Sequence, residues 1–300
     1  MSEPKNPNQY TSGPGRVTRR QFLKYLTAAG AVGLAGCTGK RYDPCPPDIK
    51  GVGCSGLGQG AVRTPAVRAP QDHPIIWYVD LEHERVLNDP TRWGSHLRTR
   101  NHRAAVLGEI AGVFCQAIHY TEVSLSLAHQ KGVRVIALSG FTTDFEYYDF
   151  STFYPVCELV KQGRIPVIAL CGGHQLLAYM FGGTCGALRR LKRGEKDPAD
   201  WAPGWYKEVG YMPVRVLQDD PIFKGLGSEP VFFESHYWEV KRLPADFELL
   251  ASTDECEVQV MRHKDCLIYG TQFHPEVYED RYPDGRTLLA NFFRIAGILA

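Results

Sequence analysis

Residues 166–177 constrain the fold more than any other segment of this chain, because they combine a strand, a sharp turn and a helix start. Residues 166–170 (PVIAL) are apolar and suit a buried strand. Cys171, Gly172 and Gly173 then turn the chain, and a helical pattern begins at His174. A buried strand that passes through a tight turn into a helix is the repeating unit of parallel sheets covered on both faces. The segment therefore predicts an α/β fold.

The chain from residue 74 onward extends this pattern. Apolar strand-like runs and helical patterns alternate at 75–79 (strand), 104–113 (helix), 114–120 (strand), 122–130 (helix), 133–138 (strand) and 156–162 (helix). Residues 81–102 are polar and are expected to be irregular. After Tyr206, strand-like runs follow one another with short turns, and a helix over 285–298 ends the domain. We therefore expect one α/β domain over 74–300, with a mostly parallel central sheet flanked by helices and added antiparallel strands in the C-terminal third.

Cys171 lies where a nucleophile would be most reactive. A tight turn between strand and helix holds such a residue in a strained conformation. The helix N-terminus favours a thiolate over a thiol, which lowers the cysteine pKa. The backbone N–H of Gly172 would point toward a developing oxyanion. A buried cysteine after a buried strand is also common without any function, so this segment alone leaves both interpretations open.

A second segment favours the functional interpretation. Residues 269–276 (YGTQFHPE) end an apolar strand with His274 and, two residues later, Glu276. A histidine can take the thiol proton, and a carboxylate can fix its tautomer and orientation. A lone His followed by an acid is usually a surface pair, but together with Cys171 these residues predict a catalytic triad.

The two segments together resemble the class I, triad-type glutamine amidotransferases. Their elbow motif reads like Pro-Val-x-Gly-x-Cys-x-Gly-His-Gln, and their second motif reads like Tyr-Gly-x-Gln-Phe-His-Pro-Glu. The resemblance covers about residues 133–298 of this chain. It implies a flavodoxin-like sheet and a thiol that attacks the γ-amide of glutamine to give a glutamyl-thioester.

The resemblance also implies roles for residues around the triad. Gly140 and Phe141 match the family's oxyanion loop, with the Phe141 N–H as a donor beside that of Gly172. Gln175 matches a position that helps to hold glutamine, and Ser235 and His236 match the stretch that contacts its amino-acid end.

Several positions depart from the family pattern. Ala169 and Phe141 replace family glycines, and Tyr237 and Trp238 follow His236 where a small and a polar residue are common. The insertion over 81–102 has no family counterpart that we can place.

The N-terminal sequence predicts an export signal. Arg19 and Arg20, followed by Phe22 and Leu23, resemble a twin-arginine signal. Residues 34–37 (LAGC) resemble a lipobox, in which Cys37 is acylated and becomes the first mature residue. The apolar stretch between them is too short to span a bilayer. We therefore expect a signal peptide over 1–36 and a protein that is exported by the twin-arginine route and lipid-anchored to the cell envelope. A first helix packed on the domain is the alternative.

Residues 37–73 are rich in proline and glycine and predict a tether without a core of its own. The formal net charge of the chain is +1, and the basic excess lies in the N-terminal 36 residues, so no nucleic-acid partner is expected. No cysteine spacing indicates zinc, no phosphate loop is present, and neither a metal nor another cofactor is expected.

These features favour a lipid-anchored thiol hydrolase that cleaves glutamine or a γ-glutamyl compound by itself. One alternative is a glutaminase subunit that donates ammonia to a separate synthetase. Another is a non-catalytic binding lipoprotein on the same fold, which the presence of all three triad residues disfavours.

Overall fold

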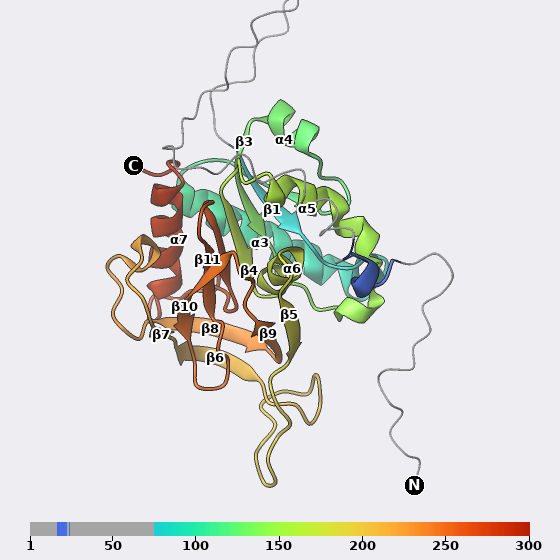
Figure 1. Ribbon diagram of the computed structural model, residues 1–300, viewed down its shortest axis with the longest axis vertical. Coiled ribbons are helices and arrows are strands. Elements are labelled where there is room, and N and C mark those ends of the chain that lie inside the picture. The colour runs from blue at the N-terminus through green and yellow to red at the C-terminus, as the bar shows by residue number, and fades with distance from the viewer. Residues whose placement is uncertain (1–16, 23, 25–74) are drawn as a thin grey trace, which may run out of the picture.

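The computed structural model describes residues 17–22, 24 and 75–300. Its centre is an eight-stranded sheet in the order β2-β1-β3-β4-β12-β11-β10-β7 (Figure 1). In that order, the strands are β2 (Cys115–His119), β1 (Ile75–Asp80), β3 (Val133–Leu138), β4 (Val167–Leu170), β12 (Ile268–Thr271), β11 (Val260–His263), β10 (Phe247–Ser252) and β7 (Arg215–Val216). The strands from β2 to β12 are parallel, and those from β12 to β7 are antiparallel.

Helices cover both faces of the sheet. Those on one face are α3 (Trp93–Ala111) and α7 (Asp284–Ile295), and those on the other are α4 (Leu125–Lys131), α5 (Tyr154–Lys161) and α6 (Gly172–Met180). Successive side chains of a strand point to opposite faces, so Ile76 and Tyr78 join one core cluster while Trp77 and Val79 join the other. Each buried apolar side chain of this size contributes roughly 1.5–3 kcal/mol relative to an exposed one. The predicted mostly parallel, helix-flanked α/β sheet is confirmed.

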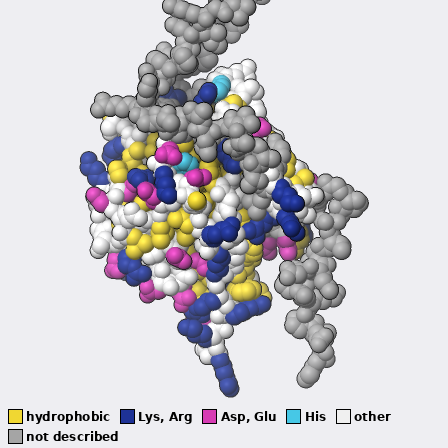
Figure 2. Space-filling model, viewed as in Figure 1, with side chains coloured by type: hydrophobic (Ala, Val, Ile, Leu, Met, Phe, Trp, Pro, Cys, Tyr) yellow, Lys and Arg dark blue, Asp and Glu magenta, His cyan; other side chains and the backbone are white. Residues whose placement is uncertain are grey.

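The added antiparallel strands are also confirmed. Besides the far half of the main sheet, two small sheets pair β5 (Thr184–Ala187) with β9 (Trp238–Arg242) and β6 (Glu208–Pro213) with β8 (Val231–His236). The loop between β5 and β6 projects from the body in Figure 1, and basic side chains gather at its tip in Figure 2. Short helices complete the described part at α2 (Glu84–Leu87), η1 (Phe145–Tyr147), η2 (Phe150–Phe153) and η3 (Pro221–Phe223).

The expectation of an irregular segment over 81–102 is wrong. The helix α3 begins at Trp93, and α2 precedes it. The buried residues of α3 are Ala104, Leu107, Ile110 and Ala111, all in its C-terminal half. The first half lies at the edge of the core and has no apolar stripe, so the usual helical periodicity is missing there.

Residues 17–22 lie on the domain. Phe22 is fully buried, with its ring 5.4 Å from that of Tyr154 and 5.3 Å from that of Phe150, and the Arg19 guanidinium lies 4.2 Å from the centre of the Tyr179 ring. A packed N-terminal segment is what the alternative to an export signal expects. Cys37 and the tether over 37–73 lie outside the described residues. No helix among the described residues is long and apolar enough to cross a membrane.

Candidate active site

Cys171 lies at a strained elbow between β4 and α6. Its φ of 48° and ψ of −109° place a non-glycine residue in a sparsely populated region. Two hydrogen bonds hold it there: its N–H donates to the Thr271 carbonyl at 2.7 Å, and its carbonyl accepts from the Gln175 N–H at 3.1 Å. The strain therefore comes from fixing the chain to the neighbouring strand and to the first turn of the helix at the same time.

His274 and Glu276 reach Cys171 because β4 and β12 are adjacent parallel strands whose carboxyl ends meet at one edge. The His274 ring lies beside Cys171, and the electrostatic interaction between the two side chains shifts the pKa of each. Its Nδ1 lies 2.9 Å from Glu276 Oε1, which leaves Nε2 for the thiol. The structure thus brings the three predicted triad residues together, with His274 between Cys171 and Glu276.

The electrostatics of these three residues favour a thiolate paired with an imidazolium. Burial raises the pKa of Cys171, but the charge and hydrogen bond of His274 outweigh it, and the net shift is downward. Burial lowers the pKa of His274, but Cys171 and Glu276 together raise it to about 10. At neutral pH the sulfur is therefore a nucleophile and the ring carries the proton that a leaving group needs.

Arg103 extends the triad by one residue. It comes from α3, and its Nη1 donates to Glu276 Oε1 at 2.7 Å. Burial raises the pKa of Glu276, but Arg103 and then His274 outweigh it and bring it to about 2. No local sequence pattern predicts that Arg103 contacts Glu276. The one available signal is that a buried carboxylate needs charged or hydrogen-bonding partners.

The predicted oxyanion loop lies against the nucleophile. A Cβ on Gly140 would be 2.9 Å from Cε1 of His274 and 3.4 Å from Cβ of Cys171, so only glycine fits there. A Cβ on Gly172 would be 2.5 Å from Cε1 of Phe141, so the Phe141 ring packs directly on the first residue of α6. The Gly172 N–H is one of the amides that a helix N-terminus leaves without an intrahelical partner.

Glu82 anchors this loop from the end of β1. Its Oε2 accepts hydrogen bonds from the Thr142 N–H at 2.7 Å and the Thr142 hydroxyl at 2.8 Å, and its Oε1 accepts from the Thr143 hydroxyl at 2.8 Å. Glu82 is buried, with 1% of its surface exposed. The sequence did offer a signal for it, because acidic residues that follow a buried parallel strand lie at the edge where sites form.

The pattern that defines the family Glutamine amidotransferase class-I matches residues 115–296. The chain belongs to the class I glutamine amidotransferase family. It is 38% identical to a subunit of the glutamine-hydrolyzing GMP synthase of Pyrococcus furiosus over 144 residues, which are 48% of this chain and 67% of that protein. The corresponding protein of Methanocaldococcus jannaschii is 32% identical over 186 residues, which are 62% of this chain and 86% of that protein.

Solved structures agree with this fold. A putative GMP synthase subunit from Thermoplasma acidophilum superposes with a TM-score of 0.56 at 27% identity, covering 75% of this chain and 94% of that one. The protein SMU.1228c, at 13% identity and a TM-score of 0.52 over 75% of this chain and 99% of its own, shares the fold. Arg103 and Glu82 precede residue 115, so these two supports of the amidotransferase site lie outside the matched family pattern.

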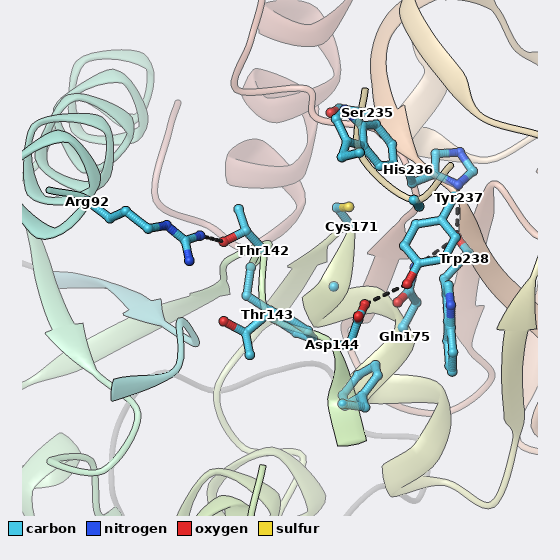
Figure 3. Close-up of a pocket in the computed structure, with 15 residues that line it drawn as sticks. Arg92, Thr142, Thr143, Asp144, Cys171, Gln175, Ser235, His236, Tyr237 and Trp238 are labelled. Atoms are coloured by element: carbon cyan, nitrogen blue, oxygen red, sulfur yellow. Dashed lines mark hydrogen bonds between the residues drawn. The ribbon is translucent and has the colours of Figure 1, made fainter. Parts of the chain in front are cut away.

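A cavity of about 500 Å³ opens beside Cys171 in this amidotransferase domain (Figure 3). Its walls carry both aromatic and polar side chains and come from the oxyanion loop, the strand β8, the turn after it and the β5–β6 loop. The lining residues include Phe141, Phe145, Trp201, Tyr237 and Trp238. Two departures from the family pattern, Phe141 and the pair 237–238, therefore shape the cavity.

The three predicted substrate-binding residues all line this cavity but differ in what they can offer. The Gln175 amide donates to the Trp238 carbonyl at 2.9 Å and to Gln272 Oε1 at 3.1 Å. The His236 ring is buried, with Nδ1 donating to the Trp238 carbonyl at 2.8 Å and Nε2 lying 2.9 Å from Glu208 Oε2. Gln175 and His236 thus shape the wall, and Ser235 lines the cavity next to His236.

Glu208, His236 and Cys256 are the described residues whose donor atoms have the spacing of a metal site, within 4.8 Å of one another. Protein donors already occupy the Glu208 carboxylate: Nε2 of His236, the Gln259 amide at 2.8 Å and the Thr253 hydroxyl at 2.6 Å. We therefore interpret this cluster as a buried polar network that ties β6 to β8.

Proposed function

We propose that this chain hydrolyses the γ-carboxamide of glutamine with Cys171 as the nucleophile. The observation that carries the proposal is the position of His274 between Glu276 and Cys171, with Cys171 at a strained elbow. Membership of a family whose members are cysteine-dependent glutamine amidohydrolases supports it.

The proposed reaction follows from the positions of these groups. The Cys171 thiolate attacks the amide carbon, and the N–H groups of Gly172 and Phe141 stabilise the negative charge on its oxygen. His274 transfers its proton to the nitrogen, the C–N bond breaks, ammonia leaves and a glutamyl-thioester remains. His274 then takes a proton from water, the hydroxide attacks the thioester, and glutamate leaves as the thiolate is restored.

The relatives support the expectation of a glutaminase subunit that donates ammonia to a synthetase better than the expectation of a stand-alone hydrolase. The similar proteins are named as subunits of a glutamine-hydrolyzing GMP synthase. We therefore propose that a separate synthetase receives the ammonia. On this proposal the chain hydrolyses glutamine slowly by itself and faster when the partner is bound.

Stand-alone cleavage of a γ-glutamyl compound is the second candidate. The observation that favours it is the cavity of about 500 Å³, partly lined by aromatic side chains, which leaves space for a leaving amine larger than ammonia. Its volume lies within the roughly 300–1,000 Å³ typical of sites for larger organic ligands.

One substrate screen tests both candidates. The purified full chain is incubated with glutamine and with γ-glutamyl anilides and peptides, and glutamate and the released amine are measured together. Rapid ammonia release from glutamine without a partner counts against the synthetase proposal, and activity confined to γ-glutamyl amines favours the second candidate. Labelling by diazo-oxo-norleucine that is lost in Cys171→Ala is expected for either, and the absence of labelling in the unaltered chain points to the non-catalytic alternative.

Export and lipid anchoring are a separate proposal, supported by the Arg19-Arg20 pair and the lipobox that ends at Cys37. Replacing both arginines by lysine should retain the protein in the cytoplasm, and Cys37→Ala should release it from the membrane fraction. Unchanged localisation of both variants would overturn the proposal. Because Arg19 and Phe22 pack on the domain, the signal must detach before export machinery can bind it.

A further inference from the structure

The cavity beside Cys171 holds two charged side chains that the proposed reaction does not use. Arg92 precedes α3, and its Nη2 donates to the Thr142 hydroxyl at 2.9 Å. Asp144 accepts a hydrogen bond from the Tyr237 hydroxyl at 2.6 Å (Figure 3). Both line the cavity and both are exposed. The guanidinium has five N–H donors and the carboxylate has two oxygens, so these contacts leave each group with capacity for a ligand.

The residues predicted to hold the amino-acid end of the substrate do not offer such charges. The Gln175 amide donates to two protein oxygens, and the His236 ring is buried against Glu208 and Glu234. Among the residues that line the cavity in the described part of the chain, Arg92 and Asp144 are the cation and the carboxylate open to solvent. A substrate that carries one charge of each sign would match them.

We propose that Arg92 binds the α-carboxylate and Asp144 the α-ammonium group of the substrate. This proposal rests on the proposed function, since it assumes that a γ-amide carbon lies at Cys171. Only three carbon–carbon bonds separate that carbon from the α-carbon, so both charged groups of a free amino acid enter the same cavity. The site therefore takes γ-amides of free glutamate, such as glutamine or a γ-glutamyl compound. It rejects glutamine within a peptide, which lacks both charges.

The two residues are held in different ways, and each can keep its place when a ligand binds. Arg92 contacts the loop that Glu82 anchors, through Thr142. Asp144 follows the same loop and is joined to Tyr237 across the cavity. A guanidinium and a carboxylate matched in this way form charge-assisted hydrogen bonds with a zwitterion.

Three substrates separate the two contacts. Glutamine has both charges, glutamine α-amide lacks the carboxylate, and Nα-acetylglutamine lacks the ammonium group. Losing one charge-assisted contact should raise KM about tenfold. Arg92→Gln should raise KM for glutamine and Nα-acetylglutamine but not for the α-amide, while Asp144→Asn should raise KM for glutamine and the α-amide but not for Nα-acetylglutamine. The kcat should change little, because neither residue touches the reacting atoms.

Matched controls use exposed charges on the helices that directly follow Arg92 and Asp144. Arg98→Gln on α3 and Glu146→Gln on η1 should leave every KM unchanged, and Arg92→Lys should recover part of the loss. An equal loss with all three substrates means that the variants only disturb the loop and overturns the proposal, as does an unchanged KM.

Calorimetry with Cys171→Ala separates binding from turnover. Tight binding of glutamine with at least tenfold weaker binding of the other two supports the subsite even where no ammonia is released. Equal or no binding of all three ligands overturns the subsite, whereas failure of the unaltered chain to hydrolyse any γ-amide counts against the proposed function alone.

Discussion

At the scale of single residues, Cys171 and His274 have opposite pKa shifts that should be visible in thiol reactivity. The pKa of Cys171 is lowered, and that of His274 is raised to about 10. Alkylation of Cys171 by iodoacetamide should therefore stay fast and nearly independent of pH across the neutral range. In His274→Gln the imidazolium is gone while burial still raises the thiol pKa, so alkylation should be slow at pH 7 and should accelerate only above about pH 9.

The same pair sets the alkaline limit of catalysis. Hydrolysis needs the His274 proton for the leaving amine, so kcat should fall as pH passes about 10 even though the thiolate persists. Glutamine turnover followed across the alkaline range tests this. A kcat that stays constant as the pH passes 10 contradicts this role of the His274 proton.

Arg103 is a positioning residue whose effect passes through Glu276. Arg103→Gln removes the first of the two charges that lower the Glu276 pKa and leaves a buried carboxylate with one partner fewer. We expect kcat to fall about tenfold with KM unchanged, because the loss is in orienting His274. The acid limb of the pH–rate profile should move upward, since the carboxylate then takes a proton at higher pH.

The Arg103–Glu276 pair should also make the free energy of unfolding depend on pH. A carboxylate with a lowered folded-state pKa contributes stability above its ordinary pKa of 4.5, and that stability is lost as pH falls toward about 2. Urea unfolding from pH 7 to pH 3 should show a smaller loss in Arg103→Gln than in the unaltered chain. The variant Arg98→Gln, on the exposed side of α3, is the control for both measurements, and Arg103→Lys should restore part of the activity.

At the scale of elements, the oxyanion loop depends on β1 although the two are far apart in sequence. Glu82 receives three hydrogen bonds from Thr142 and Thr143, and the Phe141 N–H directly precedes them. Each Glu82 oxygen accepts a backbone N–H, that of His83 or that of Thr142, so in Glu82→Gln the new amide group faces one of these donors and that bond is lost.

Loss of that anchor should lower kcat by roughly 10- to 100-fold, in line with the cost of disturbing an oxyanion donor. The proposed Arg92 contact should weaken as well, because Arg92 is attached to the same loop through Thr142. Glutaminase kinetics of Glu82→Gln beside Glu84→Gln, an exposed neighbour on α2, measure this. Equal activity of the two variants would show that the loop holds its shape without Glu82.

At the scale of the whole molecule, the sequence predicted the layered α/β sheet because its strands are continuous apolar runs that have to be buried on both faces. It also predicted the antiparallel C-terminal strands and placed Cys171 directly after a strand. It missed the first half of α3, since a helix at the edge of the core needs no apolar stripe. For the same reason Arg103 and Arg92 could not be connected to the site: their role depends on which helix packs over β1, and local patterns carry no information on that.

The N-terminal segment is where sequence and structure favour different roles, and its packing makes a prediction about the whole chain. Phe22 is fully buried against Phe150 and Tyr154, so Phe22→Ala leaves a cavity in the main core. Replacing a buried Phe by Ala typically costs about 3–5 kcal/mol. Urea unfolding of the full chain should show a loss of that order, and Arg20→Ala, at an exposed position, should show none.

Export gives this packing a second consequence. If residues 1–36 are removed after translocation, the mature protein loses Phe22 and exposes the aromatic surface that it covers, so the mature form should be less stable than the full chain by a similar amount. Comparing the urea midpoints of the full chain and of the form recovered from the cell envelope tests this directly. Equal urea midpoints of the two forms, together with an unchanged midpoint in Phe22→Ala, would mean that the segment does not pack on the domain in solution. The segment could then bind the export machinery without first detaching.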